Sequence, residues 1–456
     1  MSTDNKRMDW DSLLHAGRYG ALKKPASADM RRPYQRDFDR IVFSTAFRRM
    51  QDKTQVFPVP KSDFVHNRLT HSLEVSSVGR SLGSIGGYII LHKENLDSGI
   101  HPESFGDIVA AACLAHDVGN PPFGHSGEKA IAKYFSSAEG ARHRPYLSER
   151  QWADLLYYEG NAAGFRILTN HHPEEKAGGL LLTYATLGAF SKYPGEAEPK
   201  KVKYTGQTSL KKFGFFQSEK EIFDRVATEL KLLDGSTDSK KAWKRHPLAF
   251  LTEAADNICY RIIDLEDGFK LGYIHLEEME ELLKYFLIYP DKDMDGLKTY
   301  GMIKDHGEKA GYLRAKAINA LVKETAKVFD DKYEDIMHGE FDQELTDYIR
   351  SDDQFNQTIL DCNKRLYNSR KVVEIEIAGY RILSGLLEEF AGILIKPEDL
   401  PNKKLKELIP RQFRPQHNGN YYDDLMKITD FVARMTDSYA IDLYRKIKGI
   451  SLPEIY

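Results

Sequence analysis

The sequence contains 456 residues, 41% of them hydrophobic, and its 65 basic and 68 acidic residues leave a formal net charge of −3. A hydrophobic fraction of this size can fill a substantial core, which excludes a disordered or fibrous chain. The near-neutral charge gives no support to a globally basic nucleic-acid-binding protein.

Hydrophobic periodicity taken in chain order predicts an all-α, mainly helical fold. Residues 1–36 are polar and basic and are expected to form an N-terminal arm. Residues 37–270 carry successive helical patterns and are expected to form the core of the protein. Within them, residues 191–245 are rich in Lys, Gly and Pro and are expected to be a loop insertion. Residues 271–456 are expected to form a helical C-terminal portion.

The spacing of the cysteines and the lack of long apolar runs indicate the cellular compartment. Cys113, Cys259 and Cys362 lie far apart and form no CxxC pair, which fits neither a disulfide framework nor a zinc ribbon and is typical of a reducing compartment. The opening residues, MSTDNKRMDW, contain no run of signal-peptide length. No stretch reaches the ~18 apolar residues of a membrane span. We therefore expect a cytoplasmic protein without a membrane segment.

The first histidine of interest is His71, in the segment NRLTHSLEV at residues 67–75. On a helix, His71 shares one face with Val75, Val78 and Leu82. A histidine among apolar residues is most often an ordinary core or surface residue. His71 alone therefore indicates little.

A second motif ends the apolar segment that begins at Asp107. The segment is built of small apolar residues and then places His116 and Asp117 together, before Gly119 stops the helix. Two metal-ligating side chains at the end of a buried helix are costly unless something satisfies them. An interaction of His116 with the helix dipole is the alternative explanation.

The loop that follows, NPPFGHSGE, holds His125 and Glu128 near the ends of two helices. Its Gly and Pro residues fix an unusual backbone path. Ser126 as a helix cap, and Glu128 as a complement to the positive helix N-terminus, are the structural alternatives.

A third motif covers residues 251–268. At helical spacing, Asp256, Tyr260, Asp264 and Asp267 form a mostly acidic stripe that contains no cation. Like charges on one helix face cost stability unless a cation lies opposite them. A water-facing acidic stripe is the alternative. Two imidazoles and two carboxylates drawn from these motifs would suit a divalent ion.

These motifs resemble the H…HD…D signature of the HD-domain metal-dependent phosphohydrolases. More narrowly, the stretches FRRMQDKTQVFP, NRLTHSLEV, AHDVGNPPFGHSGE and EAADNICYRIIDLEDG are similar to the bacterial deoxyguanosine triphosphate triphosphohydrolases. The segments VVEIEIAGYRILSGLLEEF and DFVARMTDSYA extend the resemblance over most of the chain. The chain departs from the family pattern at three positions, where we expect a glycine near Arg434, a basic residue near Ser438 and a glutamine at Ala163.

The resemblance implies an HD-domain catalytic core that hydrolyses deoxynucleoside triphosphates, with dGTP favoured, to deoxynucleoside and inorganic triphosphate. It implies one divalent metal, Mn²⁺ or Mg²⁺ before Fe²⁺, Zn²⁺ or Ni²⁺, bound by His71, His116, Asp117 and Asp256. It makes His125 the catalytic histidine, with Glu128 orienting it. The substrate-binding positions that it implies are Gln55, Arg68, Lys203, Tyr204, Tyr260 and Asp264.

The family resemblance also implies partners. We expect a symmetric homo-oligomer, built from dimers and up to a hexamer, and a nucleotide or single-stranded DNA as an effector. An HD-type phosphatase acting on nucleoside monophosphates or cyclic nucleotides is the first alternative. The second is a non-catalytic protein that binds single-stranded nucleic acid through lysines interleaved with aromatic side chains. The residues that would form this strand-binding track are Lys200, Lys201, Lys211, Lys212, Tyr204, Phe213, Phe215 and Phe216.

Overall fold

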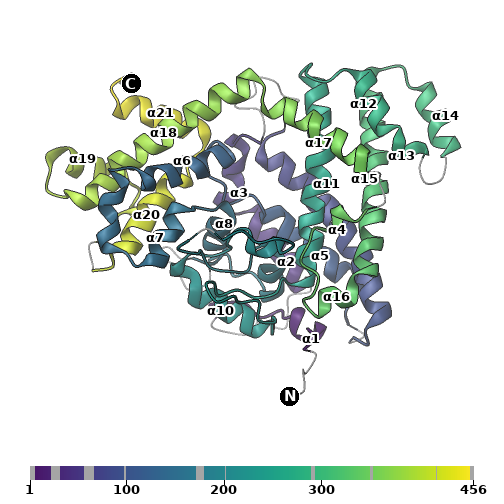
Figure 1. The fold of residues 1–456 in the computed structure, drawn as a ribbon, viewed down its shortest axis with the longest axis horizontal. Helices are drawn as coiled ribbons and strands as arrows, with labels where there is room; N and C mark the ends of the chain where they lie inside the picture. Colours follow the sequence, from purple (N-terminus) through teal and green to yellow (C-terminus); the bar gives the residue numbers. More distant parts are fainter. Residues whose placement is uncertain are drawn as a thin grey trace.

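The computed structural model describes residues 6–21, 31–55, 66–96, 99–170, 179–200, 202–288, 293–349, 353–416 and 419–451. These residues form α-helices and short 3-10 helices joined by turns, and only isolated β-bridges occur among them. The predicted all-α, mainly helical fold is confirmed (Figure 1).

The α-helices are α1 (Trp10–Leu13), α2 (Pro33–Val42), α3 (Thr45–Arg49), α4 (Arg68–Lys93), α5 (Pro102–Ala115), α6 (Gly124–Ser136), α7 (Glu149–Leu156), α8 (Gly160–Thr169), α9 (Tyr184–Phe190), α10 (Lys220–Glu229), α11 (Pro247–Lys270), α12 (Leu276–Leu283), α13 (Tyr285–Ile288), α14 (Met294–Met302), α15 (His306–Asp331), α16 (Tyr333–Met337), α17 (Asp353–Tyr367), α18 (Arg370–Ile395), α19 (Leu400–Leu408), α20 (Tyr421–Ala433) and α21 (Asp437–Ile447). The 3-10 helices are η1 (Met50–Asp52), η2 (Gly140–Tyr146), η3 (Thr208–Leu210), η4 (Gln217–Glu219), η5 (Leu345–Asp347) and η6 (Arg411–Phe413).

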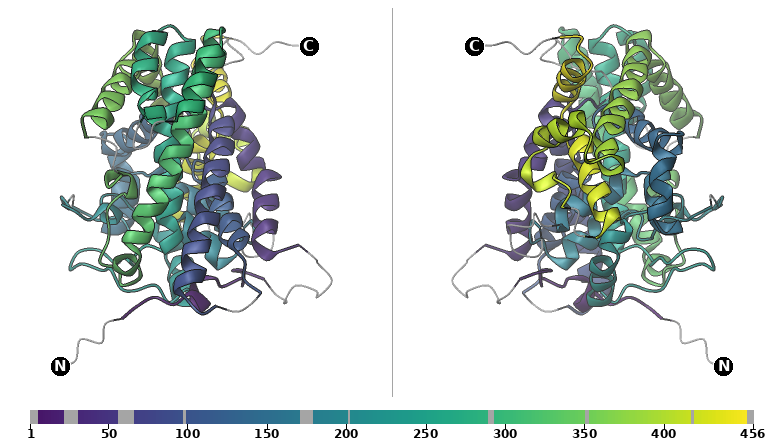
Figure 2. Two further views of the ribbon diagram at one scale, coloured as in Figure 1. Left: turned by 90° about the vertical axis from the view of Figure 1, so that its right-hand side faces the viewer. Right: turned by 90° about the vertical axis from the view of Figure 1, so that its left-hand side faces the viewer.

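The first hydrophobic core is centred on α4 and α5, which pack along each other with α11 and α15 beside them (Figures 1 and 2). Glycines on α4 allow the close approach. A Cβ atom built on Gly83 would lie 2.8 Å from the backbone oxygen of Phe105 on α5, closer than real side chains come. The near-continuous apolar sequence of α5 follows from this burial, because its residues 108–115 are inaccessible to solvent.

A second hydrophobic core joins α6, α7 and α8 to the C-terminal helices α18, α20 and α21. Phe390 on α18 and Phe431 on α20 meet edge to face within it, with ring centroids 5.1 Å apart. Helices from residues 37–270, the expected core, thus pack directly against helices from residues 271–456, the expected C-terminal portion. This second core lies on the left in Figure 1.

A buried ion network joins elements of the two cores. The Arg166 guanidinium on α8 lies 2.9 Å from Asp430 on α20 and also pairs with Glu219. All three residues are less than 7% exposed. Because a buried charge without a partner is strongly destabilising, this network holds α8 against the C-terminal helices.

Part of residues 1–36, which were expected to form an N-terminal arm, packs into the first core. Residues 1–5 and 22–30 lie outside the described residues, but α1 places Trp10 in the first core, where its indole NH donates to Tyr333 Oη at 2.7 Å. The apolar residues Met8, Trp10 and Leu13 explain the difference, since each is 2% exposed or less.

The interpretation of residues 191–245 as a loop throughout is wrong. They contain α10, and Phe223 of this helix stacks on Phe215 with ring centroids 4.5 Å apart inside the first core. Phe213 and Phe216 are also buried. These phenylalanines are therefore not available to stack on nucleic-acid bases.

No helix in the described ranges has both the length and the apolar character needed to cross a membrane.

Candidate metal centre

The first turn of α4 supplies Arg68 and His71 to the site. Asn67 caps the helix, and its side-chain oxygen accepts a hydrogen bond from the Thr70 amide at 3.0 Å. An isolated β-bridge ties Asn67 to Thr54. The cap and the bridge fix the position of the turn, in which Arg68 and His71 are 5% and 2% exposed.

The end of α5 supplies His116 and Asp117. The helix ends at Ala115, so both residues lie in the turn that follows it. The Nδ1 atom of His116 lies 2.7 Å from the backbone oxygen of Cys113 and donates to it. This hydrogen bond selects the tautomer that leaves the Nε2 lone pair free to bind a metal.

Helix α11 completes the group by bringing Asp256 against both histidines. Its Oδ1 atom lies 3.3 Å from His71 Nε2 and 3.5 Å from His116 Nε2. The ligand atoms of His71, His116 and Asp117 all lie within 4.8 Å of one another. The structure thus brings together these four residues, called the metal cluster below.

The electrostatics of the metal cluster suit a cation. Burial would raise the pKa of Asp117, but Arg68 and the two histidines outweigh it and hold the pKa at about 2. Burial also opposes ionisation of Asp256, yet His116 and His71 keep its pKa well below the usual range. Two ionised carboxylates and an imidazole presented through its lone pair form a donor set for a divalent ion.

His125 and Glu128 lie near the N-terminal end of α6. His125 Nδ1 lies 2.9 Å from Glu128 Oε2, and the histidine side chain is 71% exposed. The other carboxylate oxygen of Glu128 accepts a hydrogen bond from the Gly160 amide at 2.8 Å. Burial opposes ionisation of Glu128, but the hydrogen bond from His125 lowers its pKa. The pair is therefore a histidine held by an ionised carboxylate.

The start of α6 touches the metal cluster through Arg68. Arg68 Nη1 lies 2.5 Å from Asp117 Oδ2, and a Cβ atom built on Gly124 would lie 2.4 Å from Arg68 Nη2. The Nε atom of Arg68 and the side-chain oxygen of Gln55 are buried without a hydrogen-bond partner in the part of the chain that the structure describes. Unpaired buried polar atoms at this place fit a polar ligand.

Tyr260 and Asp264 lie one and two turns beyond Asp256 on α11. Tyr260 stacks on Tyr367 with ring centroids 5.8 Å apart, and the Tyr367 hydroxyl donates to Asp264. Burial raises the pKa of Asp264 to about 7. Tyr367 was not expected from the sequence, because its α17 position gives no local signal of this contact.

Lys203 and Tyr204 lie in the segment between α9 and α10. Lys203 is exposed, and the Tyr204 hydroxyl donates to Glu198 at 2.7 Å. Among the described residues, neither forms a hydrogen bond or ion pair with a member of the cluster.

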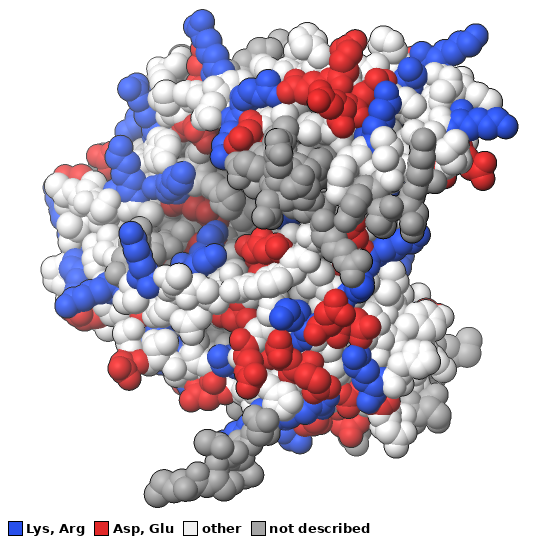
Figure 3. All heavy atoms as spheres, turned by 45° about the vertical axis from the view of Figure 1, so that its right-hand side comes forward, with Lys and Arg blue, Asp and Glu red and all other residues white. Residues whose placement is uncertain are grey.

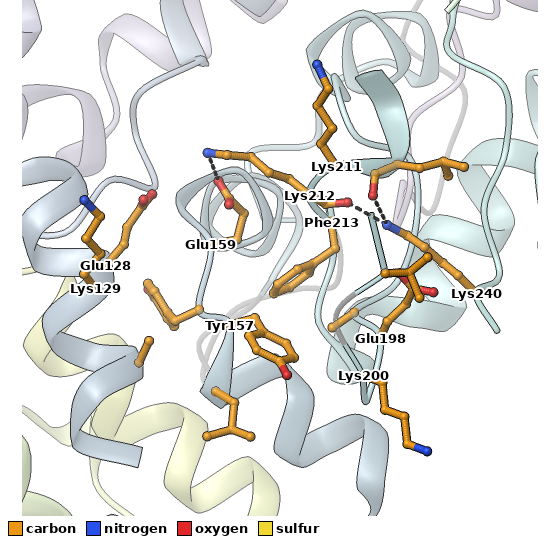
Figure 4. A pocket seen from close by; sticks show the side chains of 16 residues that line it. Glu128, Lys129, Tyr157, Glu159, Glu198, Lys200, Lys211, Lys212, Phe213 and Lys240 are labelled. Carbon is orange, nitrogen blue, oxygen red and sulfur yellow. Dashed lines mark hydrogen bonds and ion pairs between the residues drawn. The ribbon is translucent and has the colours of Figure 1, made fainter. Parts of the chain in front are cut away.

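Two other lysines, Lys192 and Lys212, lie near carboxylates of the site. The sequence did not point to either of them as a substrate-binding residue. Burial opposes protonation of Lys192, but Tyr193, Glu253 and Asp256 outweigh it and raise its pKa. Lys212 lies 3.0 Å from Glu159 (Figure 4) and also lowers the pKa of Glu128. The only sequence signal for Lys212 was the adjacent pair Lys211 and Lys212 in a segment that was expected to be a loop.

Lys240 fixes the segment that carries Lys212. Its ammonium group donates to the backbone oxygens of Lys212 at 2.6 Å and Leu210 at 3.2 Å (Figure 4). Burial lowers the pKa of Lys240 to about 8. Glu128, Glu159, Lys212 and Lys240 line one pocket, and the side chains of Lys200 and Lys211 extend away from it in the same view.

Known families and relatives match the chain over these elements. The HD domain family matches residues 68–267, and the phosphohydrolase-associated domain matches residues 362–446. The first match begins at Arg68 and encloses the whole metal cluster. The chain is 42% identical to the deoxyguanosinetriphosphate triphosphohydrolase-like protein of Synechocystis sp., a match that covers 98% of this chain and all of the relative.

The chain belongs to the deoxyguanosinetriphosphate triphosphohydrolase-like family of HD-domain phosphohydrolases. A protein of the same name from Pseudomonas aeruginosa is 37% identical over 98% of this chain and all of the relative. The deoxyguanosinetriphosphate triphosphohydrolase of Serratia proteamaculans is 30% identical over 93% of this chain and 96% of the relative. The resemblance noted in the sequence is confirmed. As an HD-domain phosphohydrolase, the protein is a hydrolase acting on phosphoric esters.

Proposed function

We propose that this phosphohydrolase cleaves deoxynucleoside triphosphates, with dGTP favoured, to the deoxynucleoside and inorganic triphosphate in a reaction that needs a divalent metal. The names of the relatives, which all refer to deoxyguanosine triphosphate, support this substrate class. The observation that carries the proposal is the convergence of the metal cluster from α4, α5 and α11 beside the paired His125 and Glu128.

In the proposed reaction, a water oxygen forms a bond to the α-phosphorus, and the bond from the α-phosphorus to the 5′-oxygen breaks. The 5′-oxygen takes up a proton and leaves as the deoxynucleoside, while the three phosphoryl groups leave together. His125, held by Glu128, is placed to exchange a proton near the scissile bond. A divalent ion bound by the cluster, Mn²⁺ or Mg²⁺ in our proposal, would supply a Lewis acid at the α-phosphate.

Arg68 is proposed to bind the α-phosphate, because a guanidinium offers forked donors for phosphoryl oxygens. Its unpaired Nε atom, and the unpaired oxygen of Gln55, support substrate contacts at these two positions. Tyr260 and Asp264 are proposed to lie at the sugar. An aromatic ring against the deoxyribose, with an acceptor at the 3′-hydroxyl, would discriminate against ribonucleotides.

For the β- and γ-phosphates we propose Lys192 and Lys212 in addition to Lys203 and Tyr204. The charge interactions of Lys192 with Asp256 and of Lys212 with Glu128 support such a role. Tyr204 donates to Glu198, which lines the same pocket as Glu128 and Lys212.

The test is to incubate the purified protein with each of the four dNTPs and Mn²⁺ or Mg²⁺, and to resolve the products by ion-exchange chromatography. We expect equimolar deoxynucleoside and inorganic triphosphate, most rapidly from dGTP, and none after chelation of the metal. Release of orthophosphate or pyrophosphate would contradict the proposal. Activity only on nucleoside monophosphates or cyclic nucleotides would support the phosphatase alternative instead.

A further inference from the structure

A buried carboxylate on α21, that of Asp437, bonds to two segments that lie far earlier in the chain. The residue is 1% exposed. Its Oδ1 atom accepts a hydrogen bond from the Phe123 amide at 3.0 Å. Its Oδ2 atom accepts one from the Thr54 amide at 2.9 Å and another from the Thr54 hydroxyl. Both oxygens of Asp437 are therefore bonded to segments that border the site.

The first of these segments is the start of α6, the helix that carries His125. Phe123 has a φ of 63° and Gly124 a φ of 58°, so the chain enters the helix through two left-handed residues. A non-glycine residue keeps this conformation only where its surroundings hold it. A Cβ atom built on Gly379 of α18 would lie 2.8 Å from the Phe123 ring, so the ring packs tightly there. This contact and the hydrogen bond to Asp437 hold Phe123, two residues before His125.

The second segment leads to the start of α4. Thr54 forms an isolated β-bridge with Asn67, the N-cap residue of α4. The amide of Arg68, the first residue of the helix, donates to the backbone oxygen of Lys53 at 3.2 Å. The segment that Asp437 holds through Thr54 is thus bonded directly to the turn that presents Arg68.

Stability of α21 does not by itself account for the burial of Asp437. Burial raises the pKa of Asp437, and the hydrogen bonds from Thr54 and Phe123, with the charge of Lys53, act against this shift. The Lys53 ammonium itself donates to the backbone oxygen of Asn120 at 2.6 Å. Asp437 is the first residue of its helix, where an acidic side chain gains from the helix dipole without being buried. Because burying a charge is costly, its contacts with the other segments need a separate reason.

We infer that Asp437 is a positioning residue for the reaction. One carboxylate oxygen sets the start of α6, and with it His125, while the other sets the first turn of α4, and with it Arg68. The inference rests on the proposed function, in which His125 exchanges a proton and Arg68 binds the α-phosphate. It gives the C-terminal portion a part in the site, since every residue proposed above for the metal or the substrate precedes residue 271.

The substitution Asp437→Asn separates the two contacts. An asparagine side chain has one acceptor oxygen, which keeps two hydrogen bonds if it faces Thr54. Its NH₂ group then faces the Phe123 amide, which is also a donor, so the substitution releases Phe123. We expect kcat for dGTP to fall about 10-fold or more, because His125 is misplaced. KM should stay close to that of the unchanged protein, because Arg68 keeps its place.

Steady-state kinetics of the Mn²⁺-loaded proteins measure both constants. The control is Asp442→Asn, the same substitution on the same helix at an exposed residue, which should match the unchanged protein. The Mn²⁺ stoichiometry should be equal in all three proteins, which shows that a lower kcat is not due to a misfolded fraction. A loss of bound Mn²⁺ in Asp437→Asn would contradict a specific effect on α6.

A double substitution shows whether Asp437 acts through His125. In a His125→Ala background, Asp437→Asn should have little further effect on kcat, because the group that it positions is already absent. A loss as large as in the unchanged background would overturn this role. Hydrogen–deuterium exchange of the amides in residues 121–128 gives a readout without substrate. We expect faster exchange in Asp437→Asn than in Asp442→Asn, and equal exchange would contradict the hold on this turn.

The outcomes separate this inference from the proposed function. If the unchanged protein hydrolyses dGTP and Asp437→Asn keeps its kcat, the inference alone is overturned. An unchanged protein that hydrolyses no dNTP would overturn the proposed function and the inference with it.

If Asp437→Asn does not fold, the other side of the contact provides the test. Thr54→Val removes the hydroxyl donor and keeps both amide hydrogen bonds to Asp437, whereas Thr54→Ser keeps all three donors. We expect kcat/KM for dGTP to be about 5-fold or more lower in Thr54→Val than in Thr54→Ser, because a hydrogen bond to a charged group is lost. Equal values in the two variants would overturn the inference.

Discussion

A histidine between two carboxylates, His66, joins the start of α4 to α11. Its Nδ1 atom lies 2.7 Å from Asp267 and its Nε2 atom 3.2 Å from Glu74. Burial would lower the pKa of His66, but the two carboxylates outweigh it and raise the pKa to about 10. The histidine is therefore charged at neutral pH, and this pair of contacts secures the helix turn that presents Arg68 and His71.

The raised pKa of His66 predicts how stability depends on pH. The folded-state pKa lies above the unfolded value of 6.5, so the contribution is complete below pH 6.5 and is lost as pH rises toward 10. We expect His66→Gln to lower the free energy of unfolding by about 3 kcal/mol near pH ~6, where both carboxylates are still ionised, and by almost nothing above pH ~10. Denaturant melts at several pH values measure this, with the exposed His92→Gln as control. A pH-independent loss would contradict the assignment.

Metal binding tests the cluster directly. Replacing His116 by Ala removes the imidazole that the Cys113 carbonyl orients, so we expect the variant to bind Mn²⁺ far more weakly than the unchanged protein. Equilibrium dialysis with elemental analysis measures the occupancy. His101→Ala, at the opposite end of α5, is the control and should bind the metal normally. Full occupancy in His116→Ala would remove this residue from the ligand set.

Arg68 tests the proposed phosphate contact. We expect Arg68→Ala to lower kcat/KM for dGTP by about 100-fold, because a charged donor aimed at the reacting phosphoryl group is lost. Steady-state kinetics measure the change, with Arg80→Ala on the same helix as the control. Kinetics equal to those of the control would exclude Arg68 from the site.

At the residue scale, the sequence pointed to the four residues of the metal cluster but not to the lysine side chains near them. His116 and Asp117 could be found because two ligating side chains follow a buried apolar helix and precede a helix stop. Lys192 could not be found, because its contact with Glu253 depends on how an irregular segment packs against α11. The roles of the individual site residues, including those of His125 and Glu128, stay predictions.

At the scale of elements, the turn between α5 and α6 depends on a close backbone contact. A Cβ atom built on Gly119 would lie 2.1 Å from the backbone oxygen of Gly160 and equally close to the backbone nitrogen of Gly164. The start of α8 therefore packs directly against this turn. Phe123, at a φ of 63°, begins α6 in the left-handed region, so the turn has little conformational freedom.

We expect Gly119→Ala to destabilise the protein by ~2 kcal/mol or more, because the clash involves backbone atoms that cannot move aside cheaply. It should also weaken Mn²⁺ binding, since Asp117 lies on the same turn. Thermal unfolding and dialysis measure the two effects. Gly311→Ala, with no atom within 4 Å of the added Cβ, is the control. Unfolding temperatures equal in both variants would contradict the tight contact.

The elements themselves were predictable where their apolar pattern is long. α4 and α11 follow from motifs that place polar ligands among apolar residues at helical spacing. α10 was missed because it spans only 10 residues in a lysine-rich stretch, and its position is decided by Phe223 packing on Phe215. The pattern of α10 by itself does not show that Phe223 packs on Phe215, which precedes the helix.

At the scale of the whole molecule, two hydrophobic cores are filled by both halves of the chain. Phe390 on α18 is fully buried in the second core with helices that come from residues 124–169. The helical C-terminal portion could be predicted from periodicity, but its insertion beside α6 and α8 could not. Domain limits near residues 36 and 270, and the expected homo-oligomer, stay predictions.

We expect Phe390→Ala to lower the free energy of unfolding by about 3–5 kcal/mol, because it leaves a cavity in the second core. Phe43→Ala, at an exposed phenylalanine, should have little effect. Denaturant unfolding followed by circular dichroism measures both. A loss no larger than that of the control would show that α18 contributes little to the second core.

The molecular surface bears on the nucleic-acid-binding alternative. On the face drawn in Figure 3, lysine and arginine side chains are interspersed with aspartate and glutamate. The buried Phe213, Phe215 and Phe216 remove three of the aromatic side chains that a strand-binding track would use. Their burial weighs against strand binding through these phenylalanines.

The division of the site between the two cores has a consequence for control of the enzyme. The metal cluster is carried by α4, α5 and α11 of the first core, whereas His125 and Glu128 sit on α6, which packs in the second. In the proposed reaction, a tilt of one helical assembly relative to the other would move His125 relative to the metal cluster while every side chain kept its own rotamer. Under that proposal, changes far from the site would alter turnover.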